Sequence, residues 1–171
     1  MRNIVLIGLP GSGKTLLGRQ LAARIGWPFR DLDEWIEARA GQTIPQIFSG
    51  YGEAFFRELE AHAVSDAART TGQIIATGGG TVLSPDNIRA LRKNGLLLFL
   101  DRPAGQILLD IDPAARPLLA AAPERLYEIE RLRRPLYLAA ADHIIDCAGP
   151  FAGLLPSLLQ IIQQEGVKIP A

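Results

Sequence analysis

Short apolar runs rich in Ile, Val and Leu alternate along the chain with longer segments of helical periodicity. This alternation is typical of βαβ units, in which parallel strands are buried between layers of helices. The expected strands are residues 3–7, 28–31, 73–77, 96–100 and 143–146. The sequence therefore predicts an α/β protein, with a five-stranded parallel sheet inside a three-layer α/β/α fold.

The expected helices lie between these strands, and several of them are followed by a glycine. Those over residues 14–25, 33–40 and 53–71 end in this way, which suits the left-handed backbone that commonly closes a helix. Ser84 and Pro85 fit the N-cap and the first residue of a helix that ends near residue 94. The remaining expected helices are residues 103–109, 123–141 and 150–165.

Composition excludes several classes of function. The 18 basic and 18 acidic side chains give a net charge of zero, whereas proteins that bind nucleic acid or anionic membranes need a basic excess. No apolar run approaches the roughly 20 residues of a membrane span. Cys147 is the only cysteine, so an internal disulfide is excluded and a reducing, cytoplasmic setting fits. We expect residues 1–171 to form a single domain around one core, and we expect a monomer.

Residues 8–15 read Gly-Leu-Pro-Gly-Ser-Gly-Lys-Thr and match the pattern G-x-x-x-x-G-K-[ST]. They follow an expected strand and precede an expected helix, which is the context that a phosphate-binding P-loop requires. Glycines let backbone N–H groups wrap around phosphate oxygens, Lys14 can reach the outer phosphates, and the Thr15 hydroxyl can ligate Mg²⁺. The sequence therefore predicts a site for a nucleoside triphosphate with Mg²⁺ as cofactor, formed by Gly11, Ser12, Gly13, Lys14, Thr15 and Leu16.

Two carboxylates, Asp31 and Asp33, follow the second expected strand. If Asp33 keeps an extended backbone, both point to one side at the carboxyl edge of the sheet, where open α/β sheets bind ligands. Phosphoryl transfer can use one carboxylate there to hold the Mg²⁺ shell and the other to accept a hydroxyl proton. The alternative is that Asp33 only caps the following helix.

Two further features have both a functional and an ordinary structural interpretation. Arg57 either contacts an anionic ligand or forms a surface pair with Glu60, three residues later. Gly78, Gly79 and Gly80 follow a buried strand, where they indicate either a close approach of ligand to backbone or a plain flexible loop.

Two more arginines lie beside prolines. Arg133 precedes Pro135 within an expected helix, where a kink can aim the arginine inward. Arg116 ends an irregular segment and suits a mobile lid residue that meets phosphates on closure, or else a solvated loop charge.

Taken together, these motifs resemble the shikimate kinases. That family carries a P-loop, D-x-D, G-E-x-x-F-R-x-x-E, a G-G-G turn, an R-P-L-L lid segment and an R-x-P-L-Y segment. Here these begin at residues 8, 31, 52, 78, 116 and 133. The resemblance runs from about residue 3 to residue 165.

The resemblance implies transfer of the ATP γ-phosphoryl group to the 3-hydroxyl of shikimate, in aromatic amino-acid biosynthesis. It implies a lid at about 110–120 and substrate-binding helices at about 33–62. The implied catalytic residues are Lys14, Asp33 and Arg116, of which Lys14 and Arg116 clamp phosphates. The implied shikimate contacts are Asp33, Arg57, Gly78, Gly79, Gly80 and Arg133, and the implied Mg²⁺ ligands are Thr15 and, through water, Asp31.

Within this resemblance, the arginines have defined partners. Arg57 and Arg133 would hold the shikimate carboxylate, while Asp33 would bind ring hydroxyls and act as base. Two alternatives remain open: another small P-loop kinase, for gluconate or nucleoside monophosphates, and a switch that binds ATP without phosphorylating a metabolite. The first lacks an account of Arg57, the three glycines and Arg133.

Overall fold

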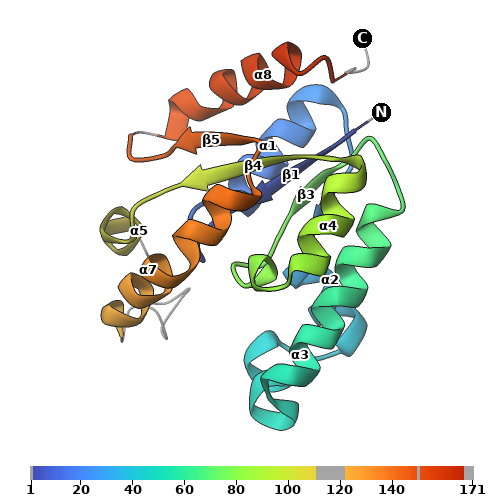
Figure 1. The fold of residues 1–171 in the computed structure, drawn as a ribbon, viewed down its shortest axis with the longest axis vertical. Coiled ribbons are helices and arrows are strands. Elements are labelled where there is room, and N and C mark those ends of the chain that lie inside the picture. The colour runs from blue at the N-terminus through green and yellow to red at the C-terminus, as the bar shows by residue number, and fades with distance from the viewer. Residues whose placement is uncertain (1, 111–121, 150, 168–171) are drawn as a thin grey trace.

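One parallel sheet of five strands forms the centre of the molecule. The computed structural model describes residues 2–110, 122–149 and 151–167. The strands lie in the order β2-β3-β1-β4-β5, and every neighbouring pair is parallel (Figure 1). They are β1 (Asn3–Ile7), β2 (Phe29–Asp31), β3 (Ile74–Ala76), β4 (Gly95–Asp101) and β5 (His143–Asp146). The predicted parallel sheet is confirmed, with each strand within one residue of its expected ends.

Helices cover both faces of this sheet. They are α1 (Lys14–Ile25), α2 (Leu32–Ala40), α3 (Ile44–Ala68), α4 (Pro85–Asn94), α5 (Ala104–Asp110), α7 (Pro123–Ala140) and α8 (Leu154–Gln164), with short 3₁₀ turns η1 (Thr81–Leu83) and η2 (Phe151–Gly153). In the described part of the chain, no helix is both long and apolar enough to cross a membrane.

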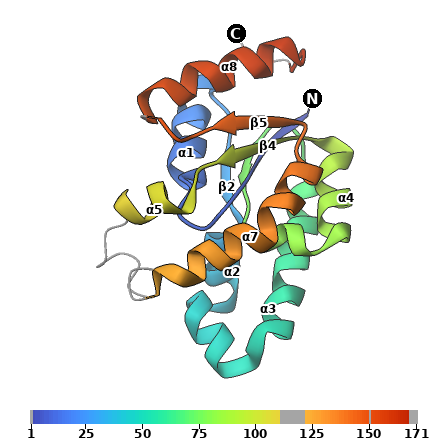
Figure 2. The ribbon, with the colours of Figure 1, turned by 60° about the vertical axis from the view of Figure 1, so that its left-hand side comes forward.

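Alternate side chains of the strands build two separate cores. Ile4 and Leu6 pack with α1 and α8, whereas Val5 and Ile7 pack with α2, α3, α4, α5 and α7. All four side chains are fully buried, and burying one such side chain stabilises the fold by about 1.5–3 kcal/mol. Figures 1 and 2 show the result, the predicted three-layer α/β/α fold.

Helix α3 departs most from expectation. It begins at Ile44 rather than residue 53, because Thr43 and Gln46 form a reciprocal capping box: the Thr43 N–H donates to Gln46 Oε1 at 2.8 Å. Gly52, with φ 82°, interrupts the helix, so the predicted segment corresponds to its second half. The helix ends at Ala68, which means that the predicted end near residue 71 was also wrong.

Two other helices differ less from expectation. Helix α7 continues through Pro135 as a single element. The last expected helix, from residue 150, is divided into η2 and α8.

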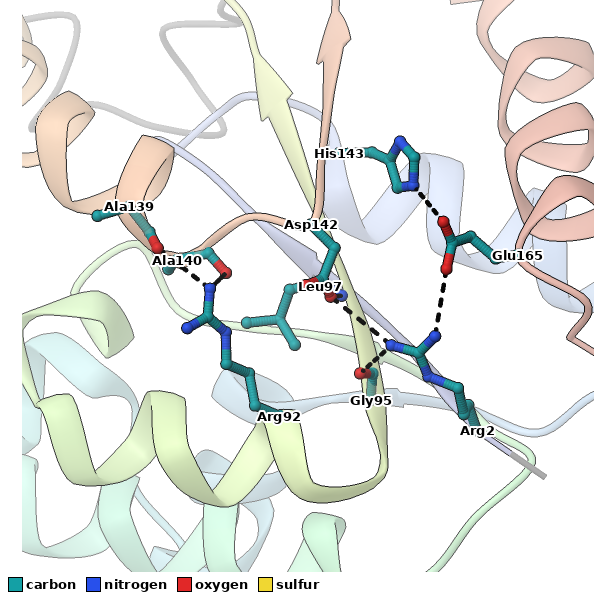
Figure 3. Close-up of polar contacts among 9 residues, drawn as sticks. All are labelled: Arg2, Arg92, Gly95, Leu97, Ala139, Ala140, Asp142, His143 and Glu165. Atoms are coloured by element: carbon teal, nitrogen blue, oxygen red, sulfur yellow. Dashed lines mark hydrogen bonds and ion pairs between the residues drawn. The ribbon is translucent and has the colours of Figure 1, made fainter.

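A polar cluster ties the chain ends together at the amino edge of the sheet (Figure 3). The Arg2 guanidinium lies 3.3 Å from the Glu165 carboxylate and donates to the Gly95 carbonyl at 3.0 Å. Glu165 also lies 2.8 Å from His143 Nε2, a contact that lowers the pKa of this exposed carboxylate. The cluster therefore joins β1, β4 and β5 to the end of α8.

Arg92 of α4 fixes the end of α7 in the same region (Figure 3). Its guanidinium donates to the carbonyls of Ala139 and Ala140, at 3.1 and 3.0 Å. These carbonyls belong to the last turn of α7, where the helix lacks internal donors and a cation is favoured. Because α7 carries Arg133, this contact helps to set the position of a predicted site residue.

Candidate active site

The P-loop joins β1 to α1, as the sequence predicts. Gly11 and Gly13 have φ values of 81° and 93°, which favour glycine over other residues. Helix α1 begins at Lys14, so the first N–H groups of the helix have no partner within it and are suited to anionic oxygens. Leu16 is 53% exposed, and because its side chain is apolar, its backbone N–H is the group that suits phosphate.

Lys14 is held across this loop by its own backbone. Its Nζ donates to the carbonyls of Gly8 and Leu9, at 2.9 and 2.8 Å, and lies 3.4 Å from Ser12 Oγ. The side chain is only 7% exposed. The ammonium is therefore fixed beside the loop rather than free in solvent, which is the preorganisation that electrostatic catalysis requires.

Asp31 links the P-loop to the second strand. The Thr15 hydroxyl donates to Asp31 Oδ2 at 2.6 Å, and Asp31 Oδ1 accepts from the N–H groups of Asp33 and Glu34. Asp31 is thus the N-cap of α2, and the alternative in which Asp33 is the cap was wrong. The expectation of an extended Asp33 was also wrong, because Asp33 lies in the first turn of α2.

The Thr15–Asp31 pair provides hard oxygen ligands. Among the residues that the structure describes, no three His, Cys, Asp or Glu side chains gather into a metal cage. A hydroxyl and one carboxylate fit Mg²⁺, which keeps several waters and takes its other ligands from substrate phosphates. The residues present therefore fit the predicted cofactor.

Asp33 has an unusual electrostatic environment. Burial, together with the negative charges of Asp31, Glu60 and Glu37, raises its pKa from 3.8 to about 6, although the positive charge of Lys14 opposes this rise. A carboxylate with such a pKa can accept a proton near neutral pH more readily than an exposed one.

The three-glycine turn follows β3, and space rather than backbone conformation explains its composition. None of Gly78, Gly79 and Gly80 has a positive φ. A Cβ on Gly78 would lie 2.7 Å from Asp33 Oδ1 and 3.1 Å from Glu60 Oε1. Side chains of the protein, Asp33 and Glu60, therefore lie close to the backbone of Gly78, where we expected a ligand to do so.

The next two glycines meet other parts of the site. A Cβ on Gly79 would lie 2.7 Å from Pro10 Cδ in the P-loop, and one on Gly80 would overlap the Arg57 guanidinium. The turn is thus packed against both the P-loop and α3. The flexible-loop interpretation does not fit this packing.

Arg57 forms the predicted pair with Glu60 and also lines a cavity. It donates to Glu60 Oε2 at 2.9 Å and to Glu53 Oε1 at 3.0 Å, so the predicted pair with Glu60 exists. Glu60 is 1% exposed and also accepts from the Thr81 hydroxyl at 2.8 Å. Because the buried Glu60 carboxylate accepts hydrogen bonds from both Arg57 and Thr81, it holds the Arg57 guanidinium in place. Arg57 also lines the pocket described below.

Arg133 reaches the site from α7 together with a residue that sequence reasoning missed. The fully buried Tyr137, one helical turn later, donates from its hydroxyl to the Gly79 carbonyl at 2.5 Å and bonds to the Arg133 side chain. Burial raises the pKa of Tyr137 to about 12, so the hydroxyl stays a donor. Arg134 points elsewhere, pairing with Asp101 at 2.7 Å. The tyrosine of R-x-P-L-Y was the available signal.

These side chains surround a cavity of about 220 Å³. It brings together every predicted acceptor residue and Pro10 of the P-loop. It also includes three apolar residues that the sequence did not single out, Ile44, Phe48 and Phe56. The lining residues are Pro10, Asp33, Ile44, Phe48, Phe56, Arg57, Glu60, Gly78, Gly79, Gly80 and Arg133. Because Pro10 belongs to the P-loop, the cavity adjoins the phosphate site. The predicted lid residue Arg116 lies outside the described residues, as does the segment 111–121.

A P-loop beside a pocket with two arginines and a carboxylate defines a P-loop kinase for a small, anionic, hydroxylated acceptor. The family model described as "Shikimate kinase" matches residues 10–155. The chain belongs to the shikimate kinase family, and it is an ATP-dependent kinase that acts on shikimate.

Individual relatives agree with this assignment. A shikimate kinase of Symbiobacterium thermophilum is 42% identical over 97% of this chain and 99% of the relative. A solved shikimate kinase from Acinetobacter baumannii in complex with shikimate is 34% identical, with a TM-score of 0.89 over 98% of this chain and 96% of that one. A gluconokinase from Sinorhizobium meliloti is 15% identical with a TM-score of 0.57, which shows a shared fold alone.

The raised pKa of Asp33 makes stability depend on pH in a defined direction. The unfolded carboxyl ionises near 3.8 and the folded one near 6, so between these values the folded state binds more protons. The free energy of unfolding therefore falls as pH rises through this window, because the unfolded state releases its proton first, and the loss is complete above it.

We predict that Asp33→Asn gains stability relative to the wild type as pH rises from 4 to 7. The gain should reach about 1–3 kcal/mol at pH 7 and nearly vanish at pH 4. Urea unfolding at several pH values measures it, with the exposed Glu58→Gln on α3 as control. If the difference in the free energy of unfolding between the variant and the wild type stays constant with pH, the pKa of Asp33 is not raised in the folded state.

Proposed function

We propose that the chain transfers the γ-phosphoryl group of ATP, with Mg²⁺ bound, to the 3-hydroxyl of shikimate, in aromatic amino-acid biosynthesis. The single observation that carries this proposal is the acceptor cavity, in which Arg57, Arg133 and Asp33 converge beside the P-loop. Cations for a carboxylate and a carboxylate for hydroxyls are the groups that a small polyhydroxy acid requires.

Arg57 and Arg133 would hold the shikimate carboxylate. Guanidinium groups bind carboxylates through paired N–H donors, which fixes the orientation of a rigid ring as well as its position. Glu60 accepts a hydrogen bond from Arg57 and so orients its guanidinium. Tyr137 orients Arg133 through a side-chain hydrogen bond and also donates to the Gly79 carbonyl. The acceptor would thus be held in a fixed orientation, so that its hydroxyl needs little further ordering.

Asp33 would bind the reacting hydroxyl and accept its proton. Its carboxylate lies at the cavity wall against Gly78, and its pKa of about 6 places proton acceptance close to neutral pH. Lys14 would stabilise the charge that develops on the transferred phosphoryl oxygens. The hydroxyl oxygen then forms the bond to phosphorus as the bond to the ADP oxygen breaks.

Thr15 and, through water, Asp31 would hold the Mg²⁺ ion of the nucleotide. When bound, this ion neutralises charge on the β- and γ-phosphates. The hydrogen bond between Thr15 and Asp31 keeps both oxygens on the side of the P-loop that faces β2.

We propose a single kinase domain over residues 1–171, with a lid at about 110–120 that closes on the nucleotide, and with Arg116 of that lid meeting the phosphates. We also propose a cytoplasmic monomer without nucleic-acid or membrane partners. The zero net charge and the single, buried Cys147 support this proposal.

A coupled assay that detects ADP tests the proposed reaction. With ATP and Mg²⁺ present, shikimate should give turnover, while gluconate and nucleoside monophosphates should stay at the background rate of ATP hydrolysis. Phosphorus NMR of the product should show a phosphate ester on the 3-oxygen. Background rates with all acceptors would contradict the proposal and favour the switch.

The two neighbouring arginines of α7 provide a matched pair of variants. Arg133→Ala should raise KM for shikimate by about 10-fold or more, because a charge-assisted bond contributes about 1.5–3 kcal/mol. Arg134→Ala should change KM little, because Arg134 pairs with the Asp101 carboxylate at the surface. Steady-state kinetics at saturating ATP measure both. Equal effects would mean that Arg133 does not bind the acceptor.

A further inference from the structure

A second cavity, of about 350 Å³, lies between α2 and α3 and shares no lining residue with the acceptor cavity. The two helices lie side by side, as Figure 2 shows. The side chains that give this cavity its chemistry are Trp35 and Arg39 of α2 with His62 and Asp66 of α3, and Arg69 just beyond it. Its volume lies within the range of small-molecule sites, about 300–1,000 Å³.

The charge of this cavity favours an anion. Arg39 and Arg69 are permanently positive, and His62 adds donors. Asp66 is its only lining carboxylate, and Arg30 pairs with this group at 3.1 Å. The negative charge of Asp66 is therefore balanced from outside the cavity, which leaves the two arginines without a balancing acid among the lining residues.

The walls of the cavity also favour a flat ring. Trp35 is partly buried, packs against the core and lines the cavity, with Leu59 as a second apolar wall. The Arg39 guanidinium lies 5.0 Å from the centre of the Trp35 ring, in a cation–π contact. Guanidinium planes and indole rings both stack on flat aromatic groups, and guanidinium also binds carboxylate through paired donors.

We propose that this cavity between α2 and α3 is a second ligand site, which binds a small aromatic carboxylate. The ring would stack against Trp35 and Leu59, and the carboxylate would be held by Arg39 and Arg69. Such a ligand uses the aromatic wall and both exposed arginines, whereas a neutral sugar or a cation would leave the arginines without an anion.

The position of this site implies coupling to the acceptor cavity. Trp35 lies two residues after Asp33 on α2, and Leu59 is adjacent to Glu60 on α3. A ligand that bridges both helices therefore bears on the elements that hold Asp33 and Arg57. By linkage, any change that it makes in the affinity for shikimate must be matched by the same change in its own affinity when shikimate is bound.

Binding can be measured without enzyme turnover, so its failure would be distinct from failure of the proposed reaction. The probe is 2-naphthoate, and the readout is the indole N–H signal of Trp35 in nitrogen–proton NMR. Trp27, buried in the core on the opposite face of the sheet, provides an internal reference. Saturating shikimate is added first, so that the probe cannot occupy the acceptor cavity through Arg57 and Arg133.

We expect the Trp35 signal to shift in a saturable manner while the Trp27 signal does not. The double variant Arg39→Gln/Arg69→Gln should weaken binding by about 10-fold or more, because each lost arginine removes a charge-assisted bond. The double variant Arg24→Gln/Arg125→Gln, which alters two exposed arginines on α1 and α7, should not. Cyclohexanecarboxylate, which lacks the flat ring, and 2-naphthylmethylamine, with reversed charge, should bind more weakly than the probe.

Three results would overturn the site: no shift of Trp35, equal affinity for the amine, or unchanged affinity in the Arg39→Gln/Arg69→Gln protein. Coupling is tested by calorimetry of shikimate with and without 2-naphthoate. We expect the two Kd values to differ, with the same factor recovered when the roles of the ligands are exchanged. Identical Kd values would overturn the coupling.

Discussion

The close packing of the glycine turn after β3 is the constraint on which the site depends. Side chains from the P-loop, α2 and α3 converge on this turn at distances that leave no room for a Cβ. Because the backbone there has no positive φ, the glycines provide space rather than conformational freedom. Tyr137 bonds to the carbonyl of Gly79 and brings in α7 as well. The glycine turn therefore positions the P-loop relative to the side chains that line the cavity beside it.

The side chains that converge on the glycine turn include several carboxylates, and their mutual repulsion makes the ionised form of Asp33 less favourable in the folded state. Asp31 performs two structural tasks, as cap of α2 and as acceptor for Thr15, and its charge helps to raise the pKa of nearby Asp33. Glu60 adds to that effect while it orients Arg57. Perturbed pKa values of this kind are common at functional sites. The fold tolerates it because two large apolar cores lie on either side of the sheet.

Local patterns predicted the sheet and the P-loop, because each depends on a short run of residues such as Gly8–Thr15. The resemblance to the shikimate kinases, rather than local pattern alone, singled out the residues that line the cavity beside the P-loop. Features set by tertiary packing were not predictable in this way. The helical state of Asp33 follows from the cap at Asp31, and the role of Tyr137 follows from the approach of α7 to the glycine turn. The early start of α3 was an exception, since Thr43 and Gln46 carried a capping-box signal that the prediction did not use.

The most direct test of this account is the affinity of Gly78→Ala for shikimate. Its new methyl group would meet Asp33 and Glu60, so calorimetry should show shikimate affinity reduced by about 10-fold or more. Affinity for ATP and cooperative unfolding should persist. The control is Gly50→Ala, at a position on α3 with open space and no positive φ, which should bind shikimate like the wild type. Wild-type shikimate affinity in a folded Gly78→Ala protein would contradict the account.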